Sequence, residues 1–187
     1  PRLERFLDAV AEADLPASKN ARVGILVDAY NALVLRSVIR HDIPSSVLDV
    51  DGFFDEETHR VAGRDLTLDV LEKRVLGPLA QDARLHFVLV CAAKGCPILE
   101  RAPYSGSDMD ARMEAAARRY VRSPAGARVV GEDLQLSKIF QWYAEDFGGR
   151  AGTLRFVRSR LAPERRRKLA PVPEITFFEY DWSVNRL

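Results

Sequence analysis

The stretch "RLHFVLVCAAKGCP" (residues 84–97) runs through an apolar segment, meets a cysteine, and then breaks into a loop rich in Ala and Gly. If residues 85–91 are extended, apolar side chains occur on both faces, which indicates a strand at the centre of a sheet. Helical spacing of apolar residues occurs on both sides of this stretch. The sequence therefore predicts an α+β fold in which a small central β-sheet is covered by several helices.

The flanking segments supply the predicted helices. Residues 2–12 carry one apolar stripe and predict a surface helix, whereas the helix that Ser18 can cap is apolar nearly all round and should be central. Further helices are predicted over 67–77, 108–123, 138–149 and 153–161, with Ser107 as one cap and Gly77-Pro78 as one stop. A hairpin is predicted around 61–64, and strands near 129–130 and over 175–182.

Length and charge limit the class of protein. The 187 residues suit one domain, and we predict an N-terminal helix over 1–21 that leads into a core over 22–187. The 28 basic and 27 acidic side chains nearly cancel, which argues against nucleic acid as a partner. The longest apolar run, 23–35, is shorter than the roughly 20 residues that span a bilayer, so no membrane span is expected. The oligomeric state stays open.

Cys91 is the candidate reactive residue. It lies where the predicted central strand enters a loop, a position at which open sheets often place sites. A thiol nucleophile needs a base or a positive environment, together with backbone donors, and the following turn offers amides and Lys94. The alternative is that Cys91 is a small buried apolar residue, a common role for a free cysteine. The residue types alone leave both interpretations open.

The partners of Cys91 are less defined. A straight strand would separate His86 from Cys91 by five steps of about 3.3 Å and place them on opposite faces, so a dyad requires a bend or another partner. Cys91 and Cys96 have the spacing C-x4-C, which is neither the redox C-x-x-C nor a zinc half-site. A disulfide across this loop stays open for an oxidising compartment. We expect no metal and no cofactor.

Five stretches of the chain resemble, in the same order, the family called domain of unknown function 547 (DUF547), found in bacteria and plants. They are "DAYNALVL", "LTLDVLEKRVLGP", "RLHFVLVCAAKGCPIL", "LSKIFQWYAEDFGG" and "YDWSVN". The resemblance runs from about residue 22 to the end and implies that the pattern residues are Asn31, Glu72, His86, Cys91, Asp146, Asp181 and Trp182. It departs at Asp28, where the family usually has Asn. In plant relatives Ser can take the place of Cys96, so the resemblance favours Cys91 as the site.

The first functional hypothesis is a thiol-dependent enzyme of the hydrolase or acyl-transfer type. Cys91 would be the nucleophile and His86 the general acid or base, oriented by Glu72 and Asn31. These polar groups lie on segments predicted to be buried, where an unpaired polar group is costly, so we expect them to contact one another. Lys94 and Asp146 are candidate binding residues, for a small-molecule or peptide substrate whose identity is open.

The second hypothesis is a non-catalytic module that binds a peptide or a protein in a cleft near 92–106. The buried polar cluster would then be structural, fixing the helices against the sheet. Plant relatives that are joined to coiled coils imply such an interaction role. Bacterial relatives that are exported imply an extracytoplasmic location, periplasmic or secreted.

Overall fold

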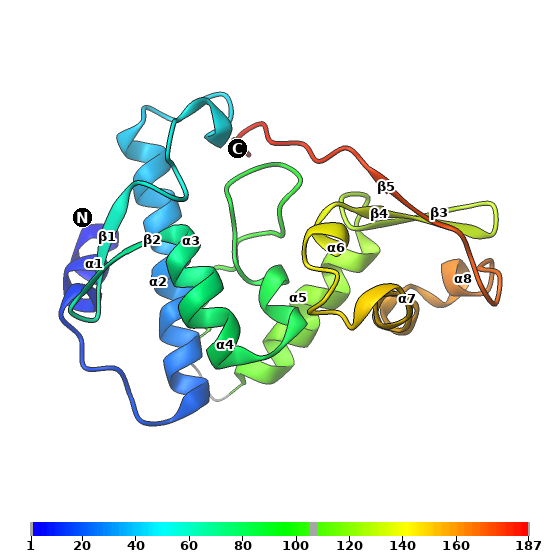
Figure 1. Ribbon diagram of the computed structural model, residues 1–187, viewed down its shortest axis with the longest axis horizontal. Helices are drawn as coiled ribbons and strands as arrows, with labels where there is room; N and C mark the ends of the chain where they lie inside the picture. The colour runs from blue at the N-terminus through cyan, green and yellow to red at the C-terminus, as the bar shows by residue number, and fades with distance from the viewer. Residues whose placement is uncertain (1, 105–107, 187) are drawn as a thin grey trace.

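The computed structural model describes residues 2–104 and 108–186 and confirms the α+β class (Figure 1). The helices are α1 (Arg2–Ala11), α2 (Lys19–Arg40), α3 (Leu68–Val70), α4 (Gly77–Ala80), α5 (Met109–Arg122), α6 (Ile139–Trp142), α7 (Gly149–Arg160) and α8 (Pro163–Arg166). The strands are β1 (Thr58–Val61), β2 (Arg64–Thr67), β3 (Ala127–Val130), β4 (Asp133–Ser137) and β5 (Ile175–Phe178). Short 3-10 helices span Val47–Asp49 and Ala83–Phe87.

Helix α2 is the central helix that its apolar pattern predicts. Its buried residues face several directions, and Val27 and Val34 are fully shielded from solvent. Helix α1 packs against it through one stripe that includes Leu7 and Val10. Ser18 occupies the position before α2, as predicted, but its side chain makes no capping hydrogen bond. Burial of the apolar faces, more than capping, therefore stabilises this helix pair.

The two sheets lie toward opposite ends of the molecule (Figure 1). β1 and β2 form the predicted antiparallel hairpin, in which Ala62 and Gly63 both have positive φ, as a two-residue hairpin turn requires. In the second sheet β4 lies between β3 and β5, antiparallel to the first and parallel to the second. Strand β5 ends at Phe178, four residues earlier than predicted.

The predicted strand over 85–91 is wrong. The chain forms a 3-10 helix at Ala83–Phe87 and continues through irregular turns. Apolar residues on both faces of an extended segment also suit a coil that the core surrounds, and Leu85, Phe87 and Val88 are each 2% exposed or less. The backbone needs no strand partner here, because the side chain of Asn31 hydrogen-bonds it, as described below.

Two predicted helix ends also differ. A π-helical segment (Leu71–Leu76) leads directly into α4, so Gly77-Pro78 does not stop the helix. Pro78 lies at the start of α4 and has no N–H to donate to the preceding π-helical turn, whereas the N–H of Gly77 donates to Glu72 O. The helix predicted over 138–149 is only the short α6, followed by turns up to Gly148. The predicted cap Ser107 lies outside the described residues.

The C-terminal segment (residues 179–186) returns from β5 across the molecule toward the end of α2 (Figure 1). It hydrogen-bonds the loop after Cys91, since the N–H of Lys94 donates to Ser183 O at 2.9 Å and the N–H of Gly95 donates to Asp181 O at 2.9 Å. Isolated bridges join Ser183 to Ser46 and Val184 to Ala93. This C-terminal segment therefore packs against the loop of residues 92–97 that follows Cys91 (the cysteine loop), from which it is distant in sequence.

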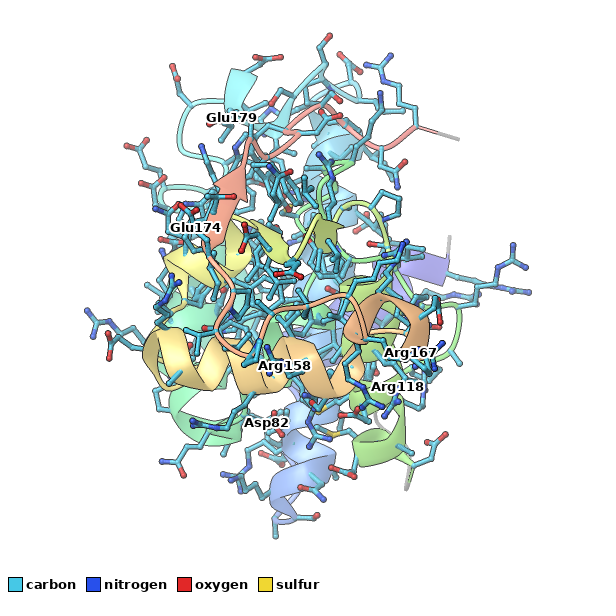
Figure 2. The ribbon with its side chains drawn as sticks, turned by 90° about the vertical axis from the view of Figure 1, so that its right-hand side faces the viewer. Asp82, Arg118, Arg158, Arg167, Glu174 and Glu179 are labelled. Carbon is cyan, nitrogen blue, oxygen red and sulfur yellow. The ribbon has the colours of Figure 1, made fainter. Side chains whose placement is uncertain are left out.

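The basic run at 155–168 lies on the side of the molecule that Figure 2 faces, where Arg158 and Arg167 are labelled. Arg158 donates to the carbonyl of Pro171 at 3.1 Å, and Arg160 forms a 2.6 Å ion pair with Glu114 of α5. Arg158 and Arg160 thus join α7 to the segment around Pro171 and to α5, whereas Arg167 is exposed. Among the described residues, no helix is both long and apolar enough to cross a membrane.

His59 of β1 is a buried titratable group. It is 2% exposed, and its Nδ1 lies 3.1 Å from a guanidinium nitrogen of Arg36, which can only donate. The imidazole is therefore neutral in the folded protein. Burial lowers the pKa of His59 below 6.5, and the charges of Arg36 and Arg40 add to this, while Glu57 opposes it.

We expect the free energy of unfolding to fall as the pH drops below 6.5, because His59 then binds a proton in the unfolded chain but not in the folded chain. Each pH unit between the unfolded and folded pKa values removes about 1.4 kcal/mol. Urea unfolding from pH 7.5 to pH 5 measures this slope, and His59→Gln should flatten it. An unchanged slope in His59→Gln would assign the pH dependence to other groups.

Candidate functional site

A pocket of about 490 Å³ opens between the cysteine loop, the π-helical segment, α6 and the C-terminal segment. Cys91, His86 and Glu72 all contribute to its lining. One wall is aromatic: the rings of Trp142, Tyr180 and Trp182 pack on one another with centroids 4.8–5.6 Å apart. The pocket therefore combines a thiol, an imidazole and a carboxylate with an apolar wall, which is the usual composition of a small-molecule or peptide site.

Asn31 positions the backbone that leads to Cys91. Its side-chain N–H donates to the carbonyl of Val88 at 2.9 Å, and its Oδ1 accepts from the N–H of Val90 at 2.9 Å. Asn31 is 4% exposed, and both hydrogen bonds are buried. One side chain on α2 thus replaces the partners that a neighbouring strand would supply, and it sets where the chain turns before the cysteine.

The Cys91 thiol has several hydrogen-bonding groups around it. Its Sγ lies 3.2 Å from the hydroxyl oxygen of Tyr180, and the N–H of Cys91 donates to Cys96 Sγ at 2.9 Å. Ala92 has a left-handed backbone (φ 61°), and the N–H of Ala93 hydrogen-bonds back to Cys91. The loop and Tyr180 therefore place hydrogen-bonding groups around both sulfurs.

These contacts set opposite pKa shifts for the two cysteines. The hydrogen bond from the Cys96 thiol lowers the pKa of Cys91, and those from Tyr180 and Ala93 add to it, against the opposing effect of burial. Burial raises the pKa of Cys96 well above 9.0, and burial likewise raises the pKa of Tyr180. Cys96 and Tyr180 thus stay protonated and donate, while Cys91 is the sulfur that is most easily ionised.

His86 lies between two carboxylates. Its Nε2 is 2.7 Å from Asp146 Oδ2, and its Nδ1 is 3.9 Å from Glu72 Oε1. The ring also stacks on Tyr143, with centroids 3.7 Å apart. With its orientation fixed from three directions, the imidazole presents a defined face to the pocket.

Glu72, in the π-helical segment, links α2 to Tyr143, the residue after α6. Its Oε1 accepts from Tyr143 at 2.6 Å and its Oε2 accepts from Tyr30 of α2 at 3.1 Å. Burial raises the pKa of Tyr143, and the neighbouring carboxylate adds to the shift. Both phenols therefore stay protonated and satisfy the carboxylate, which is only 12% exposed.

The structure brings together some predicted residues and separates others. The bent chain removes the predicted opposite-face arrangement of His86 and Cys91, which line one pocket, yet no hydrogen bond joins them among the described contacts. The thiol pairs with Tyr180, and Asn31 binds backbone groups in place of the imidazole. Lys94 is exposed and does not contribute to the lining of the pocket.

Tyr180 is the site residue that the sequence analysis missed. It directly precedes Asp181 and Trp182 in the quoted stretch "YDWSVN", which is the one signal that pointed to it. Tyr30 and Tyr143 were also missed, although each lies within a stretch shared with the family. A tyrosine among apolar residues looks like any core aromatic until its hydroxyl is seen to have a polar partner.

Both cysteines are free thiols in the structure. No group of three or more His, Cys, Asp or Glu side chains in residues 2–104 and 108–186 is arranged to hold a metal ion.

Fold and site together define an α+β protein in which Cys91 lines a pocket with an aromatic wall. The family model described as "Protein of unknown function, DUF547" matches residues 16–121, which is more than half of the chain. The chain therefore belongs to the DUF547 family. The match includes Asn31, Glu72, His86 and both cysteines, whereas Tyr180 lies beyond it. No curated protein and no solved structure matches the chain.

Proposed function

We propose that this protein is a thiol-dependent enzyme of the hydrolase or acyl-transfer type, with Cys91 as the nucleophile. The single observation that carries the proposal is the position of the Cys91 sulfur in the lining of the pocket, 3.2 Å from the hydroxyl of Tyr180. Supporting it, the pKa of Cys91 is lowered, first by its hydrogen bond with Cys96. A structural cysteine in an apolar core would have a raised pKa instead.

The proposed reaction begins when the Cys91 thiolate attacks the carbonyl carbon of an ester, thioester or amide. The tetrahedral intermediate collapses to a thioester on Cys91, and the leaving alcohol, thiol or amine departs with a proton. His86, which lines the same pocket and is oriented by Glu72 and Asp146, is the proposed donor of that proton. Water, or a second substrate, then attacks the thioester, gives its proton to His86, and releases Cys91.

Alkylation by iodoacetamide at pH 7 tests the nucleophile. We expect Cys91 to react about tenfold faster than glutathione, because a lowered pKa increases the thiolate fraction at this pH. Peptide mass spectrometry assigns the label, and p-nitrophenyl acetate should leave an acetyl group on the same residue. Cys91→Ala is the control that should lose both products.

A Cys91 that reacts no faster than glutathione would contradict the proposal. So would acetylation that persists in Cys91→Ala, since another residue would then carry the acyl group.

One observation favours a binding module instead. Trp142 lines the pocket beside Trp182 and is 46% exposed, an unusual position for so large an apolar side chain. Such a wall suits a peptide that is held without reaction. Under this alternative, Cys91→Ala binds the ligand as the unaltered protein does, and no acyl group is found on Cys91.

A further inference from the structure

In the acyl-transfer proposal the second cysteine of the loop only lowers the pKa of Cys91 and forms no covalent bond, yet it is held against the first. Cys96 Sγ accepts the N–H of Cys91 at 2.9 Å and lies 3.9 Å from the carbonyl oxygen of Leu89, so it is held beside the backbone of Cys91. A turn places them together: the N–H of Cys96 donates to Ala93 O at 3.1 Å, and Ala92 has φ 61°. Both cysteines also belong to the lining of the pocket, so a small reagent that enters it reaches the pair.

We propose that Cys91 is a site of reversible oxidation by hydrogen peroxide or an alkyl hydroperoxide, and that Cys96 resolves the oxidised sulfur as an intramolecular disulfide. The inference rests on the proposed function only in requiring a reactive Cys91. It adds a second reaction at the same sulfur, and it assigns Cys96 a covalent role, which acyl transfer does not.

Oxidation takes place in two balanced steps. The Cys91 thiolate attacks the terminal peroxide oxygen, the O–O bond breaks, and the departing hydroxide or alkoxide takes a proton to become water or an alcohol, leaving Cys91 as a sulfenic acid. Cys96 sulfur then attacks the sulfenic sulfur, the S–O bond breaks, and the hydroxide leaves as water with the proton from Cys96. Two thiols lose two electrons in total, and the oxidant is reduced: hydrogen peroxide gives two waters, and an alkyl hydroperoxide gives one alcohol and one water.

The surroundings of the pair fix this order of events. Cys91 has the lowered pKa and therefore reacts first, whereas burial raises the pKa of Cys96 and keeps it protonated. The hydroxyl of Tyr180, 3.2 Å from Cys91 Sγ, is placed to donate to the departing hydroxide. Once the sulfenic acid has formed, Cys96 is the nearest thiol, because the sequence holds only two cysteines.

Formation of the disulfide has a direct consequence for the proposed enzyme. The sulfur that would carry the acyl group is then bonded to Cys96 and cannot attack a carbonyl. The loop is also protected, since a disulfide is reduced by thiols whereas a sulfinic acid is not. Oxidation to the disulfide would therefore stop the acyl-transfer reaction and also protect Cys91 from irreversible oxidation.

Hydrogen peroxide treatment of the unaltered chain at pH 7 tests the inference without any variant. We expect both free thiols to disappear together, peptide mapping to show a Cys91–Cys96 disulfide within one chain, and dithiothreitol to restore both thiols. A Cys91 sulfinic acid beside a free Cys96 would overturn the inference, as would a disulfide between two chains or the absence of any oxidation.

Cys96→Ser separates the resolving step from the attack. With folding checked by circular dichroism, peroxide should leave a sulfenic acid that dimedone traps on Cys91, followed by sulfinic acid that dithiothreitol does not reverse. The matched variant Cys91→Ala should keep a free thiol at Cys96. If iodoacetamide labels Cys91 rapidly but peroxide gives no disulfide, the further inference fails alone, whereas slow labelling contradicts the proposed function as well.

Discussion

Replacing Asn31 by alanine is expected to lower the free energy of unfolding by about 3 kcal/mol, because it strands the carbonyl of Val88 and the N–H of Val90 away from water. Each buried polar group left without a partner costs about 1–3 kcal/mol. Urea unfolding, monitored by circular dichroism, measures the loss. Asn31→Leu fills the volume but restores neither hydrogen bond, so it should be destabilised to a similar degree.

Asn20 provides the matched control. It lies in the first turn of the same helix and is exposed, so Asn20→Ala should change the stability by less than about 0.5 kcal/mol. If Asn31→Ala is no less stable than Asn20→Ala, the buried amide does not support the cysteine loop. A loss in Asn31→Ala that Asn31→Leu repairs would point to a cavity in place of the lost hydrogen bonds.

Replacing Tyr180 by phenylalanine is expected to slow the alkylation of Cys91 at pH 7 about tenfold. The substitution removes the hydroxyl that lies 3.2 Å from Cys91 Sγ but keeps the ring that packs between Trp142 and Trp182. A hydrogen bond to a charged group contributes about 1.5–3 kcal/mol, and about 1.4 kcal/mol corresponds to a factor of ten. The pH profile of alkylation should move to higher pH, since the pKa of Cys91 rises when a donor to the thiolate is lost.

Tyr104→Phe is the control for this change. Tyr104 is also buried, but among the described contacts its hydroxyl has no hydrogen-bond partner, and it does not line the pocket. Its removal should leave the alkylation profile of Cys91 unchanged. An unchanged profile in Tyr180→Phe would show that Cys96 and the loop amides alone acidify the thiol.

The local patterns were sufficient for much of the architecture. Apolar spacing predicted α1 and α2 and the difference in their burial, and the turn residues predicted the β1–β2 hairpin. These features depend on residues a few positions apart, so they can be recognised without knowing what packs against them. The shared stretches also identified the family, whose model covers Glu72, His86 and Cys91.

The segment 85–91 shows where local patterns stop being informative. An apolar run with no periodicity is compatible with a central strand and with a coil inside the core. The choice depends on which groups take its backbone hydrogen bonds, and Asn31, more than fifty positions earlier, takes two of them. No residue within 85–91 indicates that Asn31 is the hydrogen-bond partner of this backbone.

The sequence by itself determined the fold class, the central helix and the family, and it indicated Cys91 as a candidate, because these follow from residue types and short spacings. Only the tertiary structure decided that Cys91 pairs with Tyr180 and Cys96, that His86 lies between Glu72 and Asp146, and that the chain bends where a strand was expected. The physical reason is that a buried polar group binds whichever partner the packed core brings within about 3 Å, and that partner can come from any part of the chain.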